Sequence, residues 1–192
     1  MAEQGQFEVD TLLDMPAPGQ TRTGRAVALA RLLHQDCTHL LDLYRVRESL
    51  SSDHTPAGDR IVSLSPSSPD LGLEEQVQLL YSALRMCLGL LECLIQREDE
   101  EMEGELEGDY EQARKTVRDR LGHLLHSTKV LLETEEDVTP DHECTEEVDG
   151  VVGSFRAKMW TYRVLLELTH WADSASQTLH VLHREREGTD EI

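Results

Sequence analysis

Aromatic and positively charged side chains are both scarce in this sequence. Of its 192 residues, 4% are aromatic, and 18 Lys and Arg residues stand against 38 Asp and Glu residues, which gives a formal net charge of −20. This charge repels phosphate backbones and anionic lipid surfaces, so we expect neither a nucleic-acid partner nor membrane insertion. Leucine is the commonest apolar residue, and such a composition favours helices over sheets.

The sequence also lacks the segments that direct a chain into or through a membrane. Its beginning, MAEQGQFEVD, has neither the basic head nor the apolar run of a secretion signal. No stretch approaches the roughly 18 consecutive apolar residues that a membrane-spanning helix needs. We therefore expect a protein that is made in the cytoplasm without a signal peptide.

Cysteine is present, but not in a metal-binding or redox pattern. The four residues Cys37, Cys87, Cys93 and Cys144 form no CxxC motif, which argues against a zinc ribbon and a redox centre. Four thiols allow three complete pairings, and the sequence does not choose among them. Since nothing indicates an oxidising compartment, we expect all four to be reduced.

Four stretches carry apolar residues at helical spacing. They cover residues 24–47, 73–99, 109–136 and 154–186, and Ser154 is a plausible N-cap of the last one. These stretches make up one predicted domain, residues 24–186. Residues 1–23, rich in Pro and Gly, are expected to be a flexible tail, and residues 187–192 a short second tail.

The lengths of the connections constrain how the helices are joined. A 24-residue helix is about 36 Å long, and a link of about nine residues reaches at most about 30 Å, so the second and third helices should be antiparallel neighbours. The first and third links, residues 48–72 and 137–153, are long enough to return along a whole helix. Long, short and long links predict an all-α, up-up-down-down four-helix bundle with two crossover loops.

Candidate metal and catalytic residues are present but form no convincing site. Glu167 and His170 make a Glu-x-x-His pair of the kind found in di-iron bundles, and Asp36 and His39 make a poorer second pair. Neither lies on its predicted apolar stripe, so we interpret both as solvent-facing polar residues. The same interpretation holds for His123 with His126, His180 with His183, and the stretch Asp141-His142-Glu143-Cys144. No phosphate-binding loop or nucleophile elbow occurs, so we expect no enzyme, no metal and no cofactor.

An acidic run joins the second helix to the third. Eight of the twelve residues from Glu98 to Asp109 are acidic, and we interpret the run as a solvated loop.

The start of the last helix combines an aromatic ring with cations. Phe155 and Lys158 are three residues apart and therefore share one helix face, and Met159 begins the apolar stripe beside them. Arg156 and Lys158 lie in the first turn, where the helix dipole disfavours positive charge. An aromatic residue beside a cation is typical of a binding hot spot. The alternative is that Phe155 closes the end of the bundle.

Three segments resemble one protein family. They are Phe155-Arg-Ala-Lys158-Met-Trp160, which continues through Val164-Leu165-x-Glu167-Leu168 to Trp171; Leu29-Ala30-Arg31 with Asp36, Thr38, Leu40 and Tyr44; and Glu107-Gly108-Asp109-Tyr110-x-Gln112-Ala113. In order and spacing they are similar to the ciliary neurotrophic factor family, long-chain four-helix cytokines of the interleukin-6 type.

The resemblance implies a function in receptor assembly. Such a cytokine bridges a ligand-specific alpha receptor, the shared interleukin-6-type signal-transducing subunit and the leukaemia inhibitory factor receptor, and it activates kinase signalling that supports neuronal survival and differentiation. Phe155 and Lys158 match the surface for the leukaemia inhibitory factor receptor, and Arg31 matches the alpha-receptor surface. Trp160 and Trp171 match residues of the family pattern that support the structure. The resemblance also implies release to the outside without a signal peptide.

The sequence departs from the family pattern on the alpha-receptor surface. His34, Ser174 and His180 stand where arginines are expected, which leaves open which alpha receptor is recognised. A cardiotrophin-like sibling cytokine is the near alternative, and an intracellular helical adaptor without a receptor is the more distant one.

Overall fold

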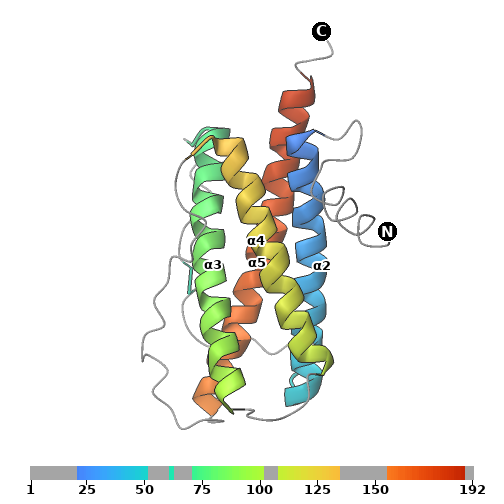
Figure 1. Cartoon of the computed structure of the whole chain (residues 1–192), viewed down its shortest axis with the longest axis vertical. Helices are drawn as coiled ribbons and strands as arrows, with labels where there is room; N and C mark the ends of the chain where they lie inside the picture. The colour runs from blue at the N-terminus through green and yellow to red at the C-terminus, as the bar shows by residue number, and fades with distance from the viewer. Residues whose placement is uncertain (1–20, 52–60, 63–70, 102–107, 135–154, 189–192) are drawn as a thin grey trace, which may run out of the picture.

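The computed structural model describes residues 21–51, 61–62, 71–101, 108–134 and 155–188. Within these residues it contains four helices and no strand: α2 (Arg22–Glu48), α3 (Leu73–Glu101), α4 (Asp109–Leu132) and α5 (Phe155–Gly188), shown in Figure 1. The predicted all-α four-helix bundle is confirmed, and each helix begins within two residues of its predicted start. Residues 1–20, the Asp141–Cys144 stretch and Ser154 lie outside the described residues.

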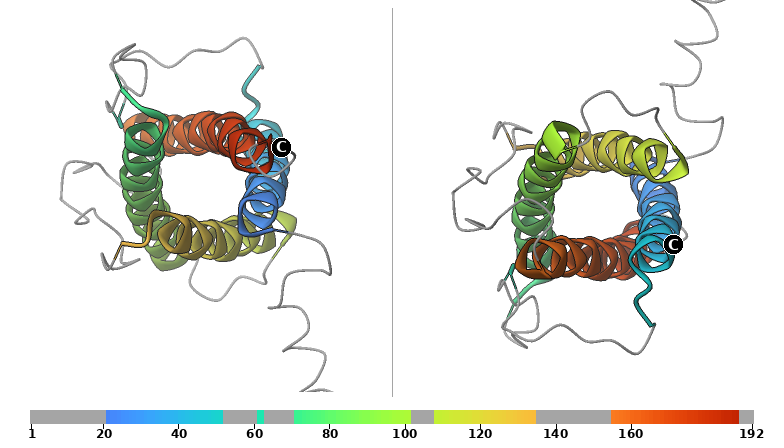
Figure 2. Two further views of the ribbon diagram at one scale, coloured as in Figure 1. Left: turned by 90° about the horizontal axis from the view of Figure 1, so that it is seen from above. Right: turned by 90° about the horizontal axis from the view of Figure 1, so that it is seen from below.

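Seen along the bundle axis, the helices lie along the sides of a square (Figure 2). α2 packs beside α4 and α5, and α3 also packs beside α4 and α5. Tyr44, near the end of α2, contacts Lys158 at the start of α5, and Glu98, near the end of α3, contacts Arg114 near the start of α4. Figure 1 shows that α2 and α3 run in one direction and α4 and α5 in the opposite direction, in agreement with these contacts.

Local sequence explains where several helices begin and end. The side chain of Thr21 caps α2 by accepting a hydrogen bond from the Gly24 N–H at 3.1 Å. At the start of α4, the Gly108 N–H donates to the Glu111 carboxylate at 2.9 Å. α2 and α4 end at Ser49 and Glu133, whose φ angles of 55° and 51° place them in the left-handed region that stops a helix.

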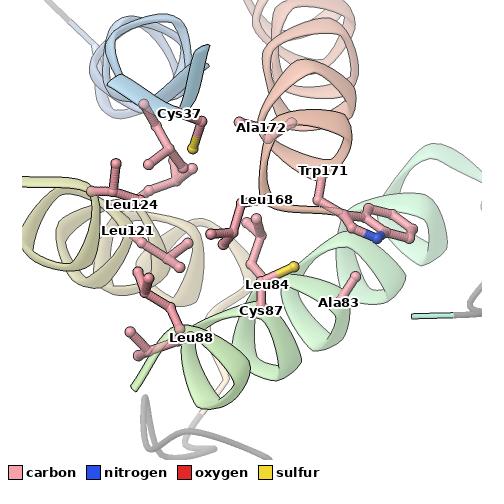
Figure 3. Packing of buried hydrophobic residues seen from close by; sticks show 14 of the residues in the cluster. Cys37, Ala83, Leu84, Cys87, Leu88, Leu121, Leu124, Leu168, Trp171 and Ala172 are labelled. Atoms are coloured by element: carbon pink, nitrogen blue, oxygen red, sulfur yellow. The ribbon is translucent and has the colours of Figure 1, made fainter. Parts of the chain in front are cut away.

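The core is formed by the predicted apolar stripes. The stripe residues are buried, except Met159, which is half-buried at the start of α5. The buried ones are Val27, Ala30, Leu33, Cys37, Leu40, Leu41 and Tyr44 in α2; Val77, Leu80, Leu84, Leu88, Leu91 and Ile95 in α3; Tyr110, Ala113, Val117, Leu121, Leu124, Thr128 and Leu131 in α4; and Tyr162, Leu165, Leu168, Ala172, Ala175, Leu179 and Leu182 in α5. Figure 3 shows Leu84 and Leu88 of α3 with Leu121 and Leu124 of α4 around a shared interior, where side chains from all four helices meet. Burial of such side chains contributes about 1.5–3 kcal/mol each and is the main stabilising term of the bundle.

α3 is more deeply buried than a single stripe predicts. Tyr81, Ala83, Leu90 and Leu94 are buried in addition to the stripe, and Val62, from the first long link, is fully buried in the same core. The segment Leu73–Glu100 is long and apolar enough to cross a membrane by length and composition, which corrects the expectation that no such stretch exists. Because 67% of its apolar window is buried within the bundle, packing against the other helices accounts for this apolarity.

Among the described residues, one cysteine differs from the sequence expectation. Cys37 and Cys87 are buried thiols, and burial raises the pKa of Cys37, so this thiol stays protonated and packs as a small apolar group. Cys93 is disulfide-bonded, so the expectation of four reduced thiols is wrong there. Spacing along a chain does not specify which cysteines a fold brings together, and this is why the sequence missed the disulfide.

Candidate functional site

Three tyrosines gather at the end of the bundle where α2 and α3 end and α4 and α5 begin. We call this region the tyrosine end. The ring of Tyr44, in α2, lies 5.9 Å from the ring of Tyr110 in α4 and 6.4 Å from the ring of Tyr162 in α5, between centroids. All three are buried. Tyr44 therefore connects α2 to both of its neighbours.

Phe155 and Lys158 project from the first turn of α5 at this end. Phe155 is 74% exposed, so within the described structure it does not close the bundle by packing into the core. The Lys158 ammonium lies 2.9 Å from a carboxylate oxygen of Glu48, the last residue of α2. The Lys158 side chain is 46% exposed and that of Glu48 only 16%. An exposed ring thus lies beside a cation that the neighbouring helix already holds.

The backbone of the same turn is also held from α2. The Tyr44 hydroxyl donates a hydrogen bond to the Lys158 carbonyl oxygen at 2.9 Å. Burial raises the pKa of Tyr44, so its hydroxyl remains a donor at every physiological pH. One turn further along α5, Arg45 donates to the Tyr162 hydroxyl at 3.3 Å. α2 therefore fixes both the position and the rotation of the start of α5.

The antiparallel packing explains the charge that looked misplaced in the sequence. Lys158 lies in the first turn of α5, which has a partial positive charge, and Glu48 lies in the last turn of α2, which has a partial negative charge. Each charge is unfavourable on its own helix but faces the opposite charge on the adjacent helix. Arg156 is exposed, and nothing in the structure explains its place in this turn.

The two tryptophans of α5 are positioned differently. Trp160 is half-buried against the core, and the guanidinium of Arg97 in α3 lies 5.3 Å from the centre of its ring. Trp171 is 1% exposed and lies between α5 and α3, beside Ala83 (Figure 3). Its indole N–H donates to Glu167 at 3.1 Å.

This hydrogen bond corrects the interpretation of Glu167 as a solvent-facing residue. Glu167 is 7% exposed, although His170, the second member of the pair, is exposed. α5 contacts both α2 and α3, so its buried arc is wider than the apolar stripe. The carboxylate is buried because the indole N–H of Trp171 requires an acceptor there.

A buried ion cluster lies at the join between α3 and α4. The Arg114 guanidinium is 2.9 Å from Glu98 and 2.9 Å from Asp99, and the Tyr110 hydroxyl donates to Glu98 at 2.9 Å. α3 continues through the first residues of the acidic run, so the expectation of a solvated loop is wrong for Glu98. Burial raises the pKa of Glu98, an effect that Arg114 and the Tyr110 hydroxyl oppose. The pKa of Arg114 is raised, because Glu98 and its other partners outweigh burial, and Arg114 stays charged.

The other candidates from the sequence lie elsewhere on the bundle. Arg31 is exposed on α2, the helix that packs beside α5. Asp36 pairs with Arg120 of α4 at 2.8 Å and thereby joins α2 to α4, while His39 is exposed. Among the described residues, no three His, Cys, Asp or Glu side chains come close enough to hold a metal ion.

Sequence reasoning missed the residues of α2 that hold the start of α5. The sequence indicated Tyr44 only as one of the residues shared with the family pattern, and it indicated no role for Glu48. The available indication was that an acid occupies the last turn of one helix and a lysine the first turn of another, each against its dipole preference. When two such helices pack antiparallel, the acid and the lysine lie side by side and can form an ion pair.

Comparison with known proteins identifies the family of this chain. The family described as ciliary neurotrophic factor matches residues 16–190. The chain belongs to the ciliary neurotrophic factor family. It is 27% identical to ciliary neurotrophic factor of Mus musculus over 169 residues, which cover 82% of this chain and 81% of the relative. It is 26% identical to the protein of that name from Rattus norvegicus over 171 residues, covering 85% and 84% respectively. Ciliary neurotrophic factor family members are cytokines that act through receptor complexes rather than as enzymes.

Proposed function

We propose that this cytokine assembles a cell-surface receptor complex of an alpha receptor, the shared signal-transducing subunit and the leukaemia inhibitory factor receptor, and so activates kinase signalling in neurons. Phe155 and Lys158 form the surface for the leukaemia inhibitory factor receptor. The observation that supports this assignment is a phenylalanine left 74% exposed beside an ion-paired lysine, in a turn held rigidly by α2. The protein acts outside the cell.

The chemistry of the turn indicates what a receptor must present to it. An exposed phenyl ring gains about 1.5–3 kcal/mol when an apolar pocket removes it from water. The Lys158 ammonium has three donors, of which Glu48 accepts one in the described structure, so a receptor carboxylate or carbonyl can accept another. An aromatic anchor beside a cation is the composition that dominates the binding energy of many interfaces.

The shared subunit is assigned to the outer faces of α2 and α4, which lie side by side (Figure 2). Leu32, His39 and Val46 are spaced by seven residues and therefore share one face of α2, and all three are exposed. A shallow groove between the two helices is lined by His39 together with Gln112 and Thr116 of α4. Leu32 and Val46, at 40% and 80% exposure, supply apolar area along this face.

The alpha receptor is assigned to the face that contains Arg31. This surface has fewer cations than the family pattern, since His34, Ser174 and His180 replace expected arginines. A cardiotrophin-like choice of alpha receptor is the second candidate, and this loss of charge is the observation that favours it. A panel of purified alpha-receptor ectodomains separates the two. If no cytokine-receptor ectodomain binds, the protein is an adaptor without a receptor.

The decisive experiment replaces Phe155 and Lys158 with alanine. Binding to the purified leukaemia inhibitory factor receptor ectodomain, measured by surface plasmon resonance, should weaken about 30-fold or more for each hot-spot residue. Val181→Ala is the matched control, because Val181 is an exposed apolar residue near the other end of the same helix. Wild-type affinity in both Phe155→Ala and Lys158→Ala would reject the assigned surface.

A further inference from the structure

We infer that Glu48 and Tyr44, both in the last two turns of α2, are positioning residues for Lys158. They hold the ammonium and the backbone of this lysine in the binding-competent arrangement before a receptor arrives. The inference rests on the proposed function, in which Lys158 contacts the leukaemia inhibitory factor receptor.

The Glu48 carboxylate is fixed on both sides. One oxygen lies 2.9 Å from the Lys158 ammonium, and the other lies 3.7 Å from the guanidinium of Arg47. At 16% exposure, the Glu48 side chain is more shielded from water than an ordinary surface carboxylate, so its attraction for Lys158 is screened less by solvent and salt. Glu48 therefore restricts the rotamers of a lysine that is otherwise nearly half exposed.

Tyr44 fixes the backbone to which this lysine and Phe155 are attached. Its hydroxyl donates to the Lys158 carbonyl, and its ring is enclosed by those of Tyr110 and Tyr162. A tyrosine that is 2% exposed and packed between two rings has little freedom to move. Because Phe155 lies one turn before Lys158, a fixed carbonyl at Lys158 also sets the direction in which the phenyl ring points.

Pre-ordering of this kind increases affinity without a new receptor contact. A long side chain that is immobilised only on binding costs about 0.5–1.5 kcal/mol, which corresponds to about a two- to twelvefold loss of affinity. Glu48 has already removed part of this cost. A carboxylate that merely competed with the receptor for Lys158 would have the opposite effect, since removing it would strengthen binding.

A double-mutant cycle on binding distinguishes these roles. Glu48→Ala should weaken binding to the purified leukaemia inhibitory factor receptor ectodomain about three- to tenfold in the wild-type background. In the Lys158→Ala background the same change should have no further effect, because the residue through which Glu48 acts is gone. Glu48→Gln keeps an acceptor for the ammonium and should lose less affinity than Glu48→Ala. Tyr44→Phe, which removes only the hydroxyl that holds the Lys158 carbonyl, should weaken binding about two- to fivefold in the wild-type background.

The controls separate positioning from general effects of charge or folding. Asp42→Ala removes an acid from the same helix, at a side chain that is 64% exposed and 3.6 Å from Arg45, and it should leave binding unchanged. Urea unfolding of each variant reports any loss of folded protein. An equal effect of Glu48→Ala in both backgrounds, or tighter binding by Glu48→Ala, would overturn the inference.

Different outcomes of these measurements would reject the proposed function and the positioning role. If Lys158→Ala binds as well as the wild type, the receptor surface is assigned wrongly. If Lys158→Ala binds weakly while Glu48→Ala and Tyr44→Phe bind like the wild type, the surface stands and only the positioning role is rejected.

Discussion

The two ends of the bundle are held together by different means. At the tyrosine end, three stacked or tilted tyrosines, the Glu98–Arg114 cluster and the Glu48–Lys158 pair join all four helices. At the opposite end, which we call the histidine end, Thr23 of α2 contacts His183 of α5 at 2.8 Å. A hollow lies there among the first turns of α2 and α3 and the last turns of α4 and α5.

The difference between the two ends shows which interactions fix the positions of the helices relative to one another. Leucines hold helices together, but they tolerate small shifts and rotations, because one apolar contact can replace another. Hydrogen bonds and ion pairs between named atoms permit far less freedom. In the described structure several of them lie at the end that carries Phe155 and Lys158, where the proposed receptor-binding turn requires a defined geometry.

The largest expected effect is at Arg114. Arg114→Met leaves the Glu98 carboxylate buried without its cation and should lower the free energy of unfolding by about 3–5 kcal/mol. Urea unfolding followed by circular dichroism measures this. Adding Glu98→Leu to Arg114→Met should recover part of the loss, because no buried charge then remains at that position. A single variant within about 1 kcal/mol of the wild type would show that this cluster does not hold the tyrosine end.

The pH dependence of the same cluster follows from Glu98. Burial raises its pKa in the folded state, so folding favours the protonated form. The resulting stabilisation is complete below the ordinary glutamate pKa of about 4.3 and is lost as the pH rises through the higher folded-state value. In Glu98→Gln the side chain is neutral at every pH, so this variant keeps its stability at this position as the pH rises. The free energy of unfolding of Glu98→Gln, relative to the wild type, should therefore increase between pH 4.5 and pH 7.5.

The comparison with Glu98→Gln is needed because many other carboxylates titrate over this range. The chain carries 38 acidic residues, and the titration of all of them except Glu98 is common to both proteins. A difference between variant and wild type that falls with rising pH would mean that the ion pair with Arg114 outweighs burial at Glu98.

Much of the fold could be predicted from local patterns, and most of the site could not. Helical periodicity identified the stripes that form the core, since period 3.6 depends only on neighbours along the chain. The spacing of Phe155 and Lys158 gave one face of a helix in the same way. The partners of Lys158 come from α2, and Tyr44 lies 114 residues earlier in the chain, so no local pattern could indicate it.

The burial of polar residues outside the apolar stripes could not be predicted from the sequence either. Glu98 and Glu167 look like surface residues until Arg114 and Trp171 are found beside them. Each is buried because a side chain on a neighbouring turn or helix needs a charge or an acceptor. Hydrophobic periodicity describes which face of a helix is apolar, but not which polar atoms that face must satisfy.

A smaller effect is expected at the histidine end. Thr23→Val keeps the shape of a buried side chain but removes the hydroxyl that contacts His183, so the free energy of unfolding should fall by about 0.5–1.5 kcal/mol. The Thr21 hydroxyl also lies 3.5 Å from this imidazole and remains in the variant as a second partner. We therefore expect a loss of unfolding free energy near the lower end of this range. Urea unfolding beside Arg114→Met compares the two ends directly. If Thr23→Val lowered the free energy of unfolding as much as Arg114→Met, polar contacts would stabilise the two ends equally.

The smallest effect on stability is expected at Phe155. Its ring is 74% exposed, so Phe155→Ala should change the free energy of unfolding by less than about 0.5 kcal/mol. Trp171→Ala is the informative contrast, because the same helix should lose about 3–5 kcal/mol when its buried ring is removed. A loss above about 1 kcal/mol in Phe155→Ala would mean that the ring packs onto the bundle in solution. The tyrosine end would then use Phe155 for its own stability, and a weaker affinity of this variant could no longer be attributed to a lost receptor contact.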